Sequence, residues 1–172
     1  MSAATIVVFA LLAFVAVTIF KGVRIVPQGY KWIVQRLGKY HTTLSPGLNF
    51  VIPYVDEVSY KVTTKDIVLD IPSQEVITRD NAVLLMNAVA YINLTTPEKA
   101  VYGIENYTWA IQNLVQTALR SIVGEMDLDD ALSSRDHIKA RLKASISDDI
   151  SDWGITLKTV EIQDIKPSST MQ

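Results

Sequence analysis

The longest continuous hydrophobic stretch lies at the amino-terminal end, from Ala3 to Phe20, and contains no charged residue, Pro or Gly. As a helix it would be about 27 Å long at about 1.5 Å per residue, close to the roughly 30 Å hydrocarbon core of a bilayer. Lys21 and Arg24 follow directly. We therefore expect residues 1–22 to form a single transmembrane anchor.

Two other interpretations of this stretch are weaker. A cleaved secretory signal begins with basic residues and ends at a small-residue cleavage site, whereas no Lys or Arg precedes Ala3 and Ile19–Gly22 makes a poor cleavage site. A buried core helix is disfavoured by the flanking charges.

Beyond the anchor, the pattern first takes the two-residue period of half-buried strands. Tyr30–Leu37 alternates, and Val83–Leu94 is the longest such segment, with a continuously apolar even face. Polar Lys39–Ser45 is expected to close the first of these strands. Further short strands are expected at Val23–Pro27, Glu57–Thr64, Asp66–Ile71 and Gln74–Thr78, with a break at Pro72-Ser73 and a tight turn at Arg79-Asp80-Asn81.

Between two prolines lies the short apolar run Gly47–Pro53, for which two interpretations stay open. It is either a buried strand of the core or a loop that dips into the near leaflet beside the anchor. In the second interpretation the membrane-contacting residues are Leu48, Phe50, Val51 and Ile52.

The pattern changes to the period of helices after Thr96-Pro97, a typical helix start. Helices are expected at Glu98–Tyr102, at Trp109–Val123, at Leu128–Leu132, and over an apolar ladder formed by Ile138, Leu142, Ile146 and Ile150. We expect Asp127 and Ser133 to cap the last two of these helices.

Ile155–Ile165 returns to a strand, which needs a β-bulge near Lys158 to keep its apolar residues in phase. It is expected to pair with Val83–Leu94. A run of strands followed by helices predicts an α+β fold. We divide it into a strand-rich portion at residues 23–95, an α+β portion at 96–167 and a tail at 168–172.

Charge is distributed unevenly along the chain. The first 55 residues carry five basic and no acidic side chains, while the remaining 117 carry 11 basic and 18 acidic ones. Because positive charge favours the cytoplasmic face, we expect the amino terminus outside and the domain in the cytoplasm; the absence of cysteine agrees with a reducing compartment. The basic residues of the first part are Lys21, Arg24, Lys31, Arg36 and Lys39. They suit contact with anionic headgroups, although the positive-inside rule alone explains them equally well. An acidic body argues against nucleic acid as a partner.

Motifs for catalysis are missing from the sequence. There is no cysteine, no Gly-rich phosphate loop and no Gly-x-Ser-x-Gly. His41 and His137 lie on different expected elements and are interpreted as surface residues. The acidic cluster at residues 125–130 is better explained by helix capping and solvation than by a cation. We therefore expect no catalytic residue, no metal site and no cofactor.

Small residues recur every three positions in the anchor, at Ala10, Ala13 and Ala16. Such residues let helices approach closely in lipid, so they form a candidate self-association face. A dispersed alanine composition explains them equally well.

Three long motifs carry a family resemblance: IVPQGYKWIVQRLGKYHTTLSPGLNFVIPYVD, LDIPSQEVITRDN and WGITLKTVEIQDIKP. Together they resemble the SPFH (band 7) family of stomatins and prohibitins, and within it the bacterial stomatin-like membrane proteins of the QmcA type. The resemblance implies a transmembrane helix followed by an SPFH domain with a strand-rich membrane-proximal portion and an α+β distal portion. It also matches Gly47–Pro53 to the family's membrane-contacting stretch.

The resemblance further implies a non-enzymatic, oligomeric scaffold that organises membrane microdomains and modulates neighbouring membrane proteins. Its expected partners are membrane lipid, further copies of itself in a ring or cage, an NfeD-type membrane protein and a membrane AAA protease. The expected location is the bacterial inner membrane. The alternative function is that of a non-catalytic accessory of such a protease. Family members continue into a long Ala- and Glu-rich helix, which would begin at residues 168–172.

Overall fold

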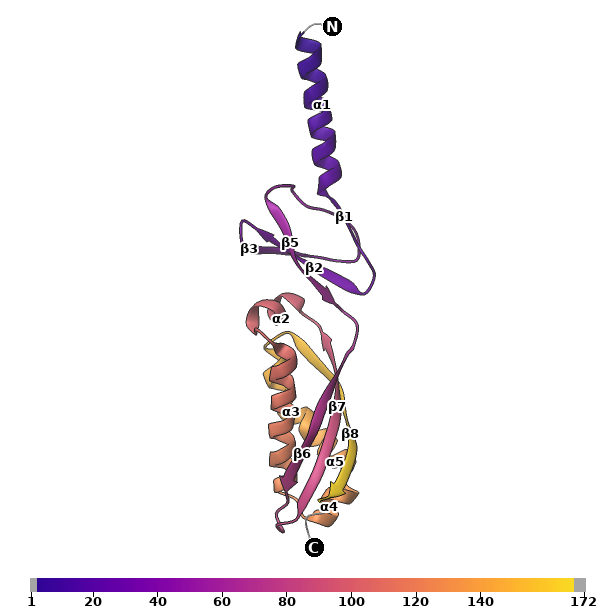
Figure 1. The fold of residues 1–172 in the computed structure, drawn as a ribbon, viewed down its shortest axis with the longest axis vertical. Helices are drawn as coiled ribbons and strands as arrows, with labels where there is room; N and C mark the ends of the chain where they lie inside the picture. Colours follow the sequence, from indigo (N-terminus) through magenta and orange to yellow (C-terminus); the bar gives the residue numbers. More distant parts are fainter. Residues whose placement is uncertain (1–2, 169–172) are drawn as a thin grey trace. The chain divides into compact units, whose positions relative to one another are not determined.

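The chain folds into two compact units, Met1–Thr64 and Lys65–Gln172, in a computed structural model that describes residues 3–168 (Figure 1). The second unit begins earlier in the chain than the sequence predicted, at residue 65 and not at residue 96. The reason is strand pairing: two strands assigned to the first portion form a sheet with the last strand of the chain. The tail expected at 168–172 lies outside the described residues apart from Ser168.

The first unit consists of a helix and two small antiparallel sheets. Helix α1 (Ala3–Gly22) runs directly into β1 (Val23–Val26), which pairs with β4 (Gly47–Phe50) in a two-stranded ribbon. In the second sheet, β2 (Tyr30–Arg36) lies between β3 (Lys39–Leu44) and β5 (Asp56–Thr63). The two sheets bury a small shared core of Val26, Val34, Leu44 and Val51.

The expectation that Lys39–Ser45 only closes the preceding strand is wrong, because most of this segment is itself a strand, β3. Its hydroxyl-rich sequence, Lys39–Leu44, has just one fully buried side chain, Leu44. Pairing with β2 and the buried Leu44 hold the segment in the sheet, although it lacks the alternating apolar pattern of a half-buried strand.

The second unit contains one three-stranded antiparallel sheet in the order β6-β7-β8. Strands β6 (Ile67–Ile77) and β8 (Ile155–Pro167) flank β7 (Val83–Leu94), whose even-numbered side chains are all buried as predicted. The pairing of β8 with β7 is confirmed, and so is the bulge, because the register skips Lys158. Pro72-Ser73 does not break β6 but forms an irregularity within one continuous strand.

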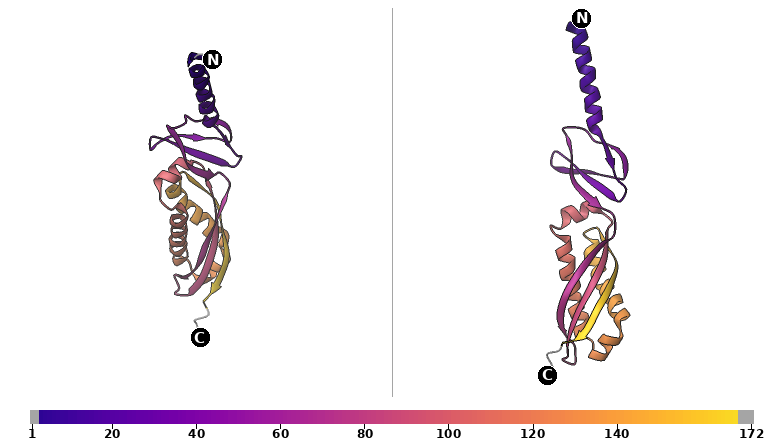
Figure 2. Two further views of the ribbon diagram at one scale, coloured as in Figure 1. Left: turned by 45° about the horizontal axis from the view of Figure 1, so that its top comes forward. Right: turned by 45° about the vertical axis from the view of Figure 1, so that its right-hand side comes forward.

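Four helices complete the second unit: α2 (Pro97–Gly103), α3 (Tyr107–Gly124), α4 (Leu128–Ser133) and α5 (Arg135–Ser151). Helices α3 and α5 cover one face of the sheet (Figures 1 and 2). The predicted ladder on α5 is the centre of this core, with each member at most 1% exposed: Ile138, Leu142, Ile146 and Ile150.

The expected helix caps are replaced by a link between the β6–β7 turn and α4. The Asp127 side chain does not cap α4 but pairs with Arg79, while the Asp80 carboxylate accepts a hydrogen bond from the Leu128 N–H at 3.2 Å. Ser133 does not cap α5 either, since its hydroxyl donates to the Asp129 carbonyl within α4. The predicted tight turn is present, with Asn81 at a φ of 65°.

Candidate functional site

The candidate site lies where α1 meets the strands of the first unit. The Val51 N–H donates a hydrogen bond of 2.8 Å to the Gly22 carbonyl at the end of α1. The Phe50 ring packs against Gly22 so closely that a Cβ there would lie 2.6 Å from it. The Lys21 ammonium lies 5.7 Å from the centre of the Tyr54 ring. The segment from Phe50 to Tyr54 is therefore held beside the last turn of α1.

A buried carboxylate fixes the loop between β4 and β5. Asp56 accepts two hydrogen bonds from the Arg36 guanidinium, at 2.6 and 3.0 Å, and one of 2.9 Å from the Ile52 N–H. The Asp56 side chain is only 4% exposed. The hydrogen bonds from Arg36 are the largest cause that lowers the pKa of Asp56, from 3.8 to about 2. Asp56 is therefore an anion at any physiological pH and keeps the loop in one shape.

Two apolar residues in this region adopt left-handed backbone conformations and are nevertheless exposed. Leu37, in the β2–β3 turn, has a φ of 50° and is 83% exposed, and Tyr54 has a φ of 69° and is 74% exposed. A hydrogen bond from the Leu37 N–H to the Val55 carbonyl joins the two loops. Left-handed conformations cost non-Gly residues free energy and cluster at functional sites. We name the exposed side chains of these two loops the apolar rim: Leu37, Ile52, Tyr54 and Val55.

The β1–β4 ribbon adds a second exposed apolar face. Val23 lies opposite Phe50 and Ile25 opposite Leu48, so the four side chains share one face of the ribbon. All four are exposed, Ile25 to 70% and Leu48 to 76%. The opposite face carries Val26, which is buried in the core.

The four predicted membrane-contacting residues are only partly together on these surfaces. Leu48 and Phe50 lie on the ribbon face and Ile52 lies on the apolar rim, all exposed. Val51 is the exception, because its side chain is 5% exposed and packs in the core; we remove it from the set. Neither interpretation of Gly47–Pro53 describes the segment as a whole, since it begins as an exposed strand and continues as a loop.

The sequence analysis missed Leu37, Tyr54, Val23 and Ile25. Leu37 carried a usable signal, because a large apolar residue directly before Gly38 in a hairpin turn is not needed by the turn. Tyr54 and the ribbon partners gave none, since their exposure depends on which strands pair.

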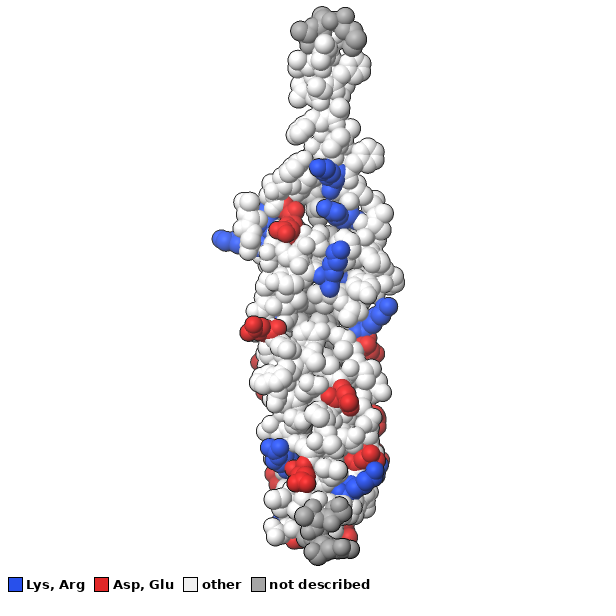
Figure 3. Space-filling view, viewed as in Figure 1, with Lys and Arg blue, Asp and Glu red and all other residues white. Residues whose placement is uncertain are grey.

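Basic side chains predominate in the first unit, as Figure 3 shows. Lys21, Arg24 and Lys39 are exposed. Arg36 differs from the expectation, because its charge is paired with Asp56. Lys31 lies opposite Val62, at the end of β2 away from the Arg36–Asp56 pair.

Helix α1 is long and apolar enough to cross a membrane, and the 18-residue apolar stretch within it is not buried inside the chain. The candidate self-association face on this helix is accessible, with all three side chains exposed: Ala10, Ala13 and Ala16.

The polar residues considered for chemistry have structural roles or are dispersed. His41 lies on β3 in the first unit and His137 on α5 in the second, both exposed. In the acidic cluster, Asp127 pairs with Arg79, and Glu125 pairs with Arg141 at 2.6 Å. Within residues 3–168, no group of three or more potential metal ligands is found.

An apolar helix is joined to small sheets, and exposed apolar side chains of these sheets and their loops lie beside the end of the helix. This arrangement is typical of a membrane-associated protein. The chain belongs to the SPFH domain / Band 7 family, whose profile it matches over residues 24–172. Members of this family are generally membrane-associated scaffolds and are generally non-catalytic.

Several curated proteins are similar to the chain. It is 41% identical over 149 residues to an uncharacterized protein of Methanocaldococcus jannaschii, covering 87% of this chain and 74% of that one. It is 36% identical over 162 residues to an uncharacterized protein of Mycobacterium tuberculosis, covering 94% of this chain and 42% of the relative. The human mitochondrial stomatin-like protein 2 is 38% identical over 140 residues, with 81% and 39% covered. The chain thus spans about two fifths of the length of the latter two relatives.

Proposed function

We propose that this chain is a membrane-anchored scaffold module that lies against the bilayer through two contacts and gathers with further copies to organise neighbouring membrane proteins. The first contact is α1, and the second is formed by the apolar rim together with the ribbon face. The observation that carries the proposal is that both surfaces are tied by direct contacts to the last turn of α1.

Exposed apolar side chains favour this interpretation over a purely structural one. Apolar side chains that are exposed to water do not stabilise the fold of the isolated chain, and this holds for Leu37, Tyr54, Ile25 and Leu48. Exposed apolar clusters mark interaction or membrane surfaces. Transferring apolar surface to lipid would be favourable by about 25 cal/mol per Å². Lys21 and Arg24 would lie at headgroup depth, where basic side chains are attracted to anionic lipid.

The proposed orientation follows from the same charges. The basic residues all lie in the last turn of α1 or after it, so the positive-inside rule supports an outside amino terminus, a cytoplasmic domain and, in a bacterium, the inner membrane as location.

The second contact is tested by depth-dependent fluorescence quenching. Because the chain has no cysteine, single Cys substitutions for Tyr54 and Leu48 each carry one environment-sensitive dye. In liposomes with quenchers fixed at different acyl depths, both labels should be quenched and shifted to the blue.

The matched control is a label at Tyr60, which is 44% exposed and lies in the middle of β5 in the same unit. It should stay unquenched by acyl-chain quenchers. Equal quenching of all three labels, or of none, would contradict the second contact.

A further inference from the structure

Two adjoining pockets lie in the first unit directly after α1. The inner pocket, of about 280 Å³, is lined by residues that include Arg24, Trp32, Asp56 and Lys61. The outer pocket, of about 360 Å³, is lined by residues that include Phe20, Lys21, Arg24 and Tyr54. Arg24, Val51 and Asp56 line both. The two pockets therefore form one recess that starts beside the end of the apolar helix.

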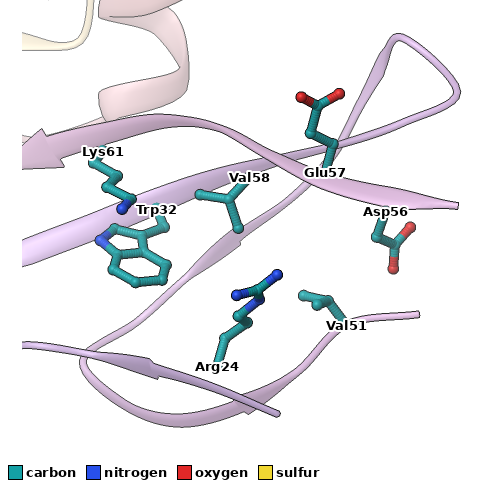
Figure 4. A pocket seen from close by; sticks show the side chains of 7 residues that line it. All are labelled: Arg24, Trp32, Val51, Asp56, Glu57, Val58 and Lys61. Carbon is teal, nitrogen blue, oxygen red and sulfur yellow. The ribbon is translucent and has the colours of Figure 1, made fainter. Parts of the chain in front are cut away.

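Arg24 extends into this recess from the inner side of the ribbon. In β1 it lies between Val23 and Ile25 of the ribbon face, so its side chain lies on the opposite face, together with buried Val26. Figure 4 shows its guanidinium between Trp32 and Lys61 on one side and Val51 and Asp56 on the other.

Arg24 is not paired within the part of the chain that the structure describes. Asp56, the acid that lines both pockets, is already neutralised by Arg36 and bound by the Ile52 N–H. No ion pair joins Glu57 to it, and Figure 4 shows the Glu57 carboxylate directed away. Lys61 lies 4.6 Å from the Trp32 ring centre and adds a second positive charge to the recess. Glu57 also lines the inner pocket, but within the described residues no carboxylate pairs with Arg24 or Lys61, so the recess holds two positive charges without an ion-pair partner.

We infer that this recess binds the phosphate group of an anionic phospholipid, one lipid per chain. A guanidinium binds phosphate oxygens through two parallel hydrogen bonds, which an ammonium does not. Lys21 in the outer pocket would contribute a third positive charge, and Phe20, which is 81% exposed, would contact the acyl chain beside α1. The inference rests on the proposed membrane contact, and it adds a defined stoichiometric site to a diffuse attraction.

Native mass spectrometry of the full chain released from detergent micelles, during titration with phosphatidylglycerol or phosphatidylcholine, tests the site. We expect one phosphatidylglycerol per chain and much weaker binding of phosphatidylcholine. Arg24→Gln should weaken phosphatidylglycerol binding about fivefold or more, equal to a loss of roughly 1 kcal/mol. The phosphatidylglycerol affinity of Arg24→Lys should lie between those of the unchanged chain and Arg24→Gln, because lysine keeps the positive charge but cannot donate two parallel hydrogen bonds.

The matched control is Lys39→Gln, which removes the same charge from the same acid-free part of the sequence but outside both pockets. It should change the affinity by less than about twofold, as expected for an exposed charge. Equal losses in the two Gln variants would show diffuse attraction and overturn the site, as would no loss in Arg24→Gln. Arg24 has no partner to lose, and far-UV circular dichroism checks that the variant is folded.

Two further results show whether the bound phosphate belongs to a lipid, and whether the lipid site or the proposed membrane contact is wrong. If inorganic phosphate at the same concentration displaces the lipid, the recess is a free-phosphate site and the lipid assignment is overturned. If the Tyr54 label is quenched in liposomes while Arg24→Gln binds lipid like the unchanged chain, the lipid site in the recess is contradicted and the membrane contact is not. An unquenched Tyr54 label would contradict the proposed function itself.

Discussion

At the scale of single residues, Asp56 is the residue that connects most of the candidate site. Its two carboxylate oxygens bind Arg36 at the end of β2, and one of them also binds the Ile52 N–H in the loop that carries part of the apolar rim. The sequence analysis gave Asp56 no role and interpreted Arg36 only as a headgroup-facing charge. Their pairing could not be predicted, because it requires the register of β2 against β5, in which Arg36 lies opposite Asp56.

Asp56→Asn should therefore destabilise the first unit, by about 1 kcal/mol, because the amide replaces charge-assisted hydrogen bonds to a half-exposed guanidinium. Folding lowers the pKa of Asp56 from 3.8 to about 2, so its stabilisation is complete above 3.8 and is lost as the pH falls through about 2. Denaturant unfolding of the two proteins at several pH values measures this. The difference between them should shrink across that window.

Lys166→Gln serves as the control for this prediction, since Lys166 and Asp164 form an exposed pair 3.6 Å apart. It should leave the unfolding curve unchanged. A difference between Asp56→Asn and the unchanged chain that persists below the lower pKa would show that the amide perturbs packing and not charge.

At the scale of elements, the join between α1 and β4 depends on a glycine. A Cβ on Gly22 would lie 2.6 Å from the Phe50 ring and 2.7 Å from the Val51 carbonyl oxygen, and the second contact is with backbone. The close approach lets the Val51 N–H reach the Gly22 carbonyl.

We predict that Gly22→Ala pushes β4 away from α1 and costs about 1–3 kcal/mol, as overpacking does. Hydrogen exchange of the Val51 amide in detergent micelles should become faster. Gly103→Ala is the matched control, since its Cβ would meet nothing closer than 4.0 Å. Unchanged exchange at Val51 in Gly22→Ala would refute the close junction.

The link between the β6–β7 turn and α4 gives a second prediction for elements. Asp80 accepts hydrogen bonds from the Thr78 hydroxyl, at 2.5 Å, and from the Leu128 N–H, and these lower the pKa of Asp80. Asp80→Ala should lower the thermal unfolding midpoint of the second unit by several degrees. Asp127→Ala, at the cap position that the sequence favoured, should lower it less, because it loses only an exposed pair with Arg79. The reverse order would restore Asp127 as the cap.

At the scale of the whole molecule, the second unit was largely predictable and the first was not. The bounds of β7, the ladder on α5 and the bulge at Lys158 could be predicted because each of these segments is long and has a clear hydrophobic period of its own. The strands of the first unit have four to eight residues and share a core of four buried side chains, so pairing decides which of them are exposed. For the same reason, Val51 was assigned to lipid and Leu37 was overlooked.

The central claim is that copies of this chain gather on a bilayer while held against it by two contacts. Single-molecule photobleaching tests it most directly, on the full chain in liposomes with one dye at the exposed position of a Glu105→Cys variant. At a protein-to-lipid ratio where chance co-occupancy is rare, the unchanged chain should bleach in several steps. A variant with Leu37→Ser and Tyr54→Ser should shift towards single steps, because α1 alone leaves the domain free to swing. Single-step bleaching of the unchanged chain at every ratio would contradict the scaffold account.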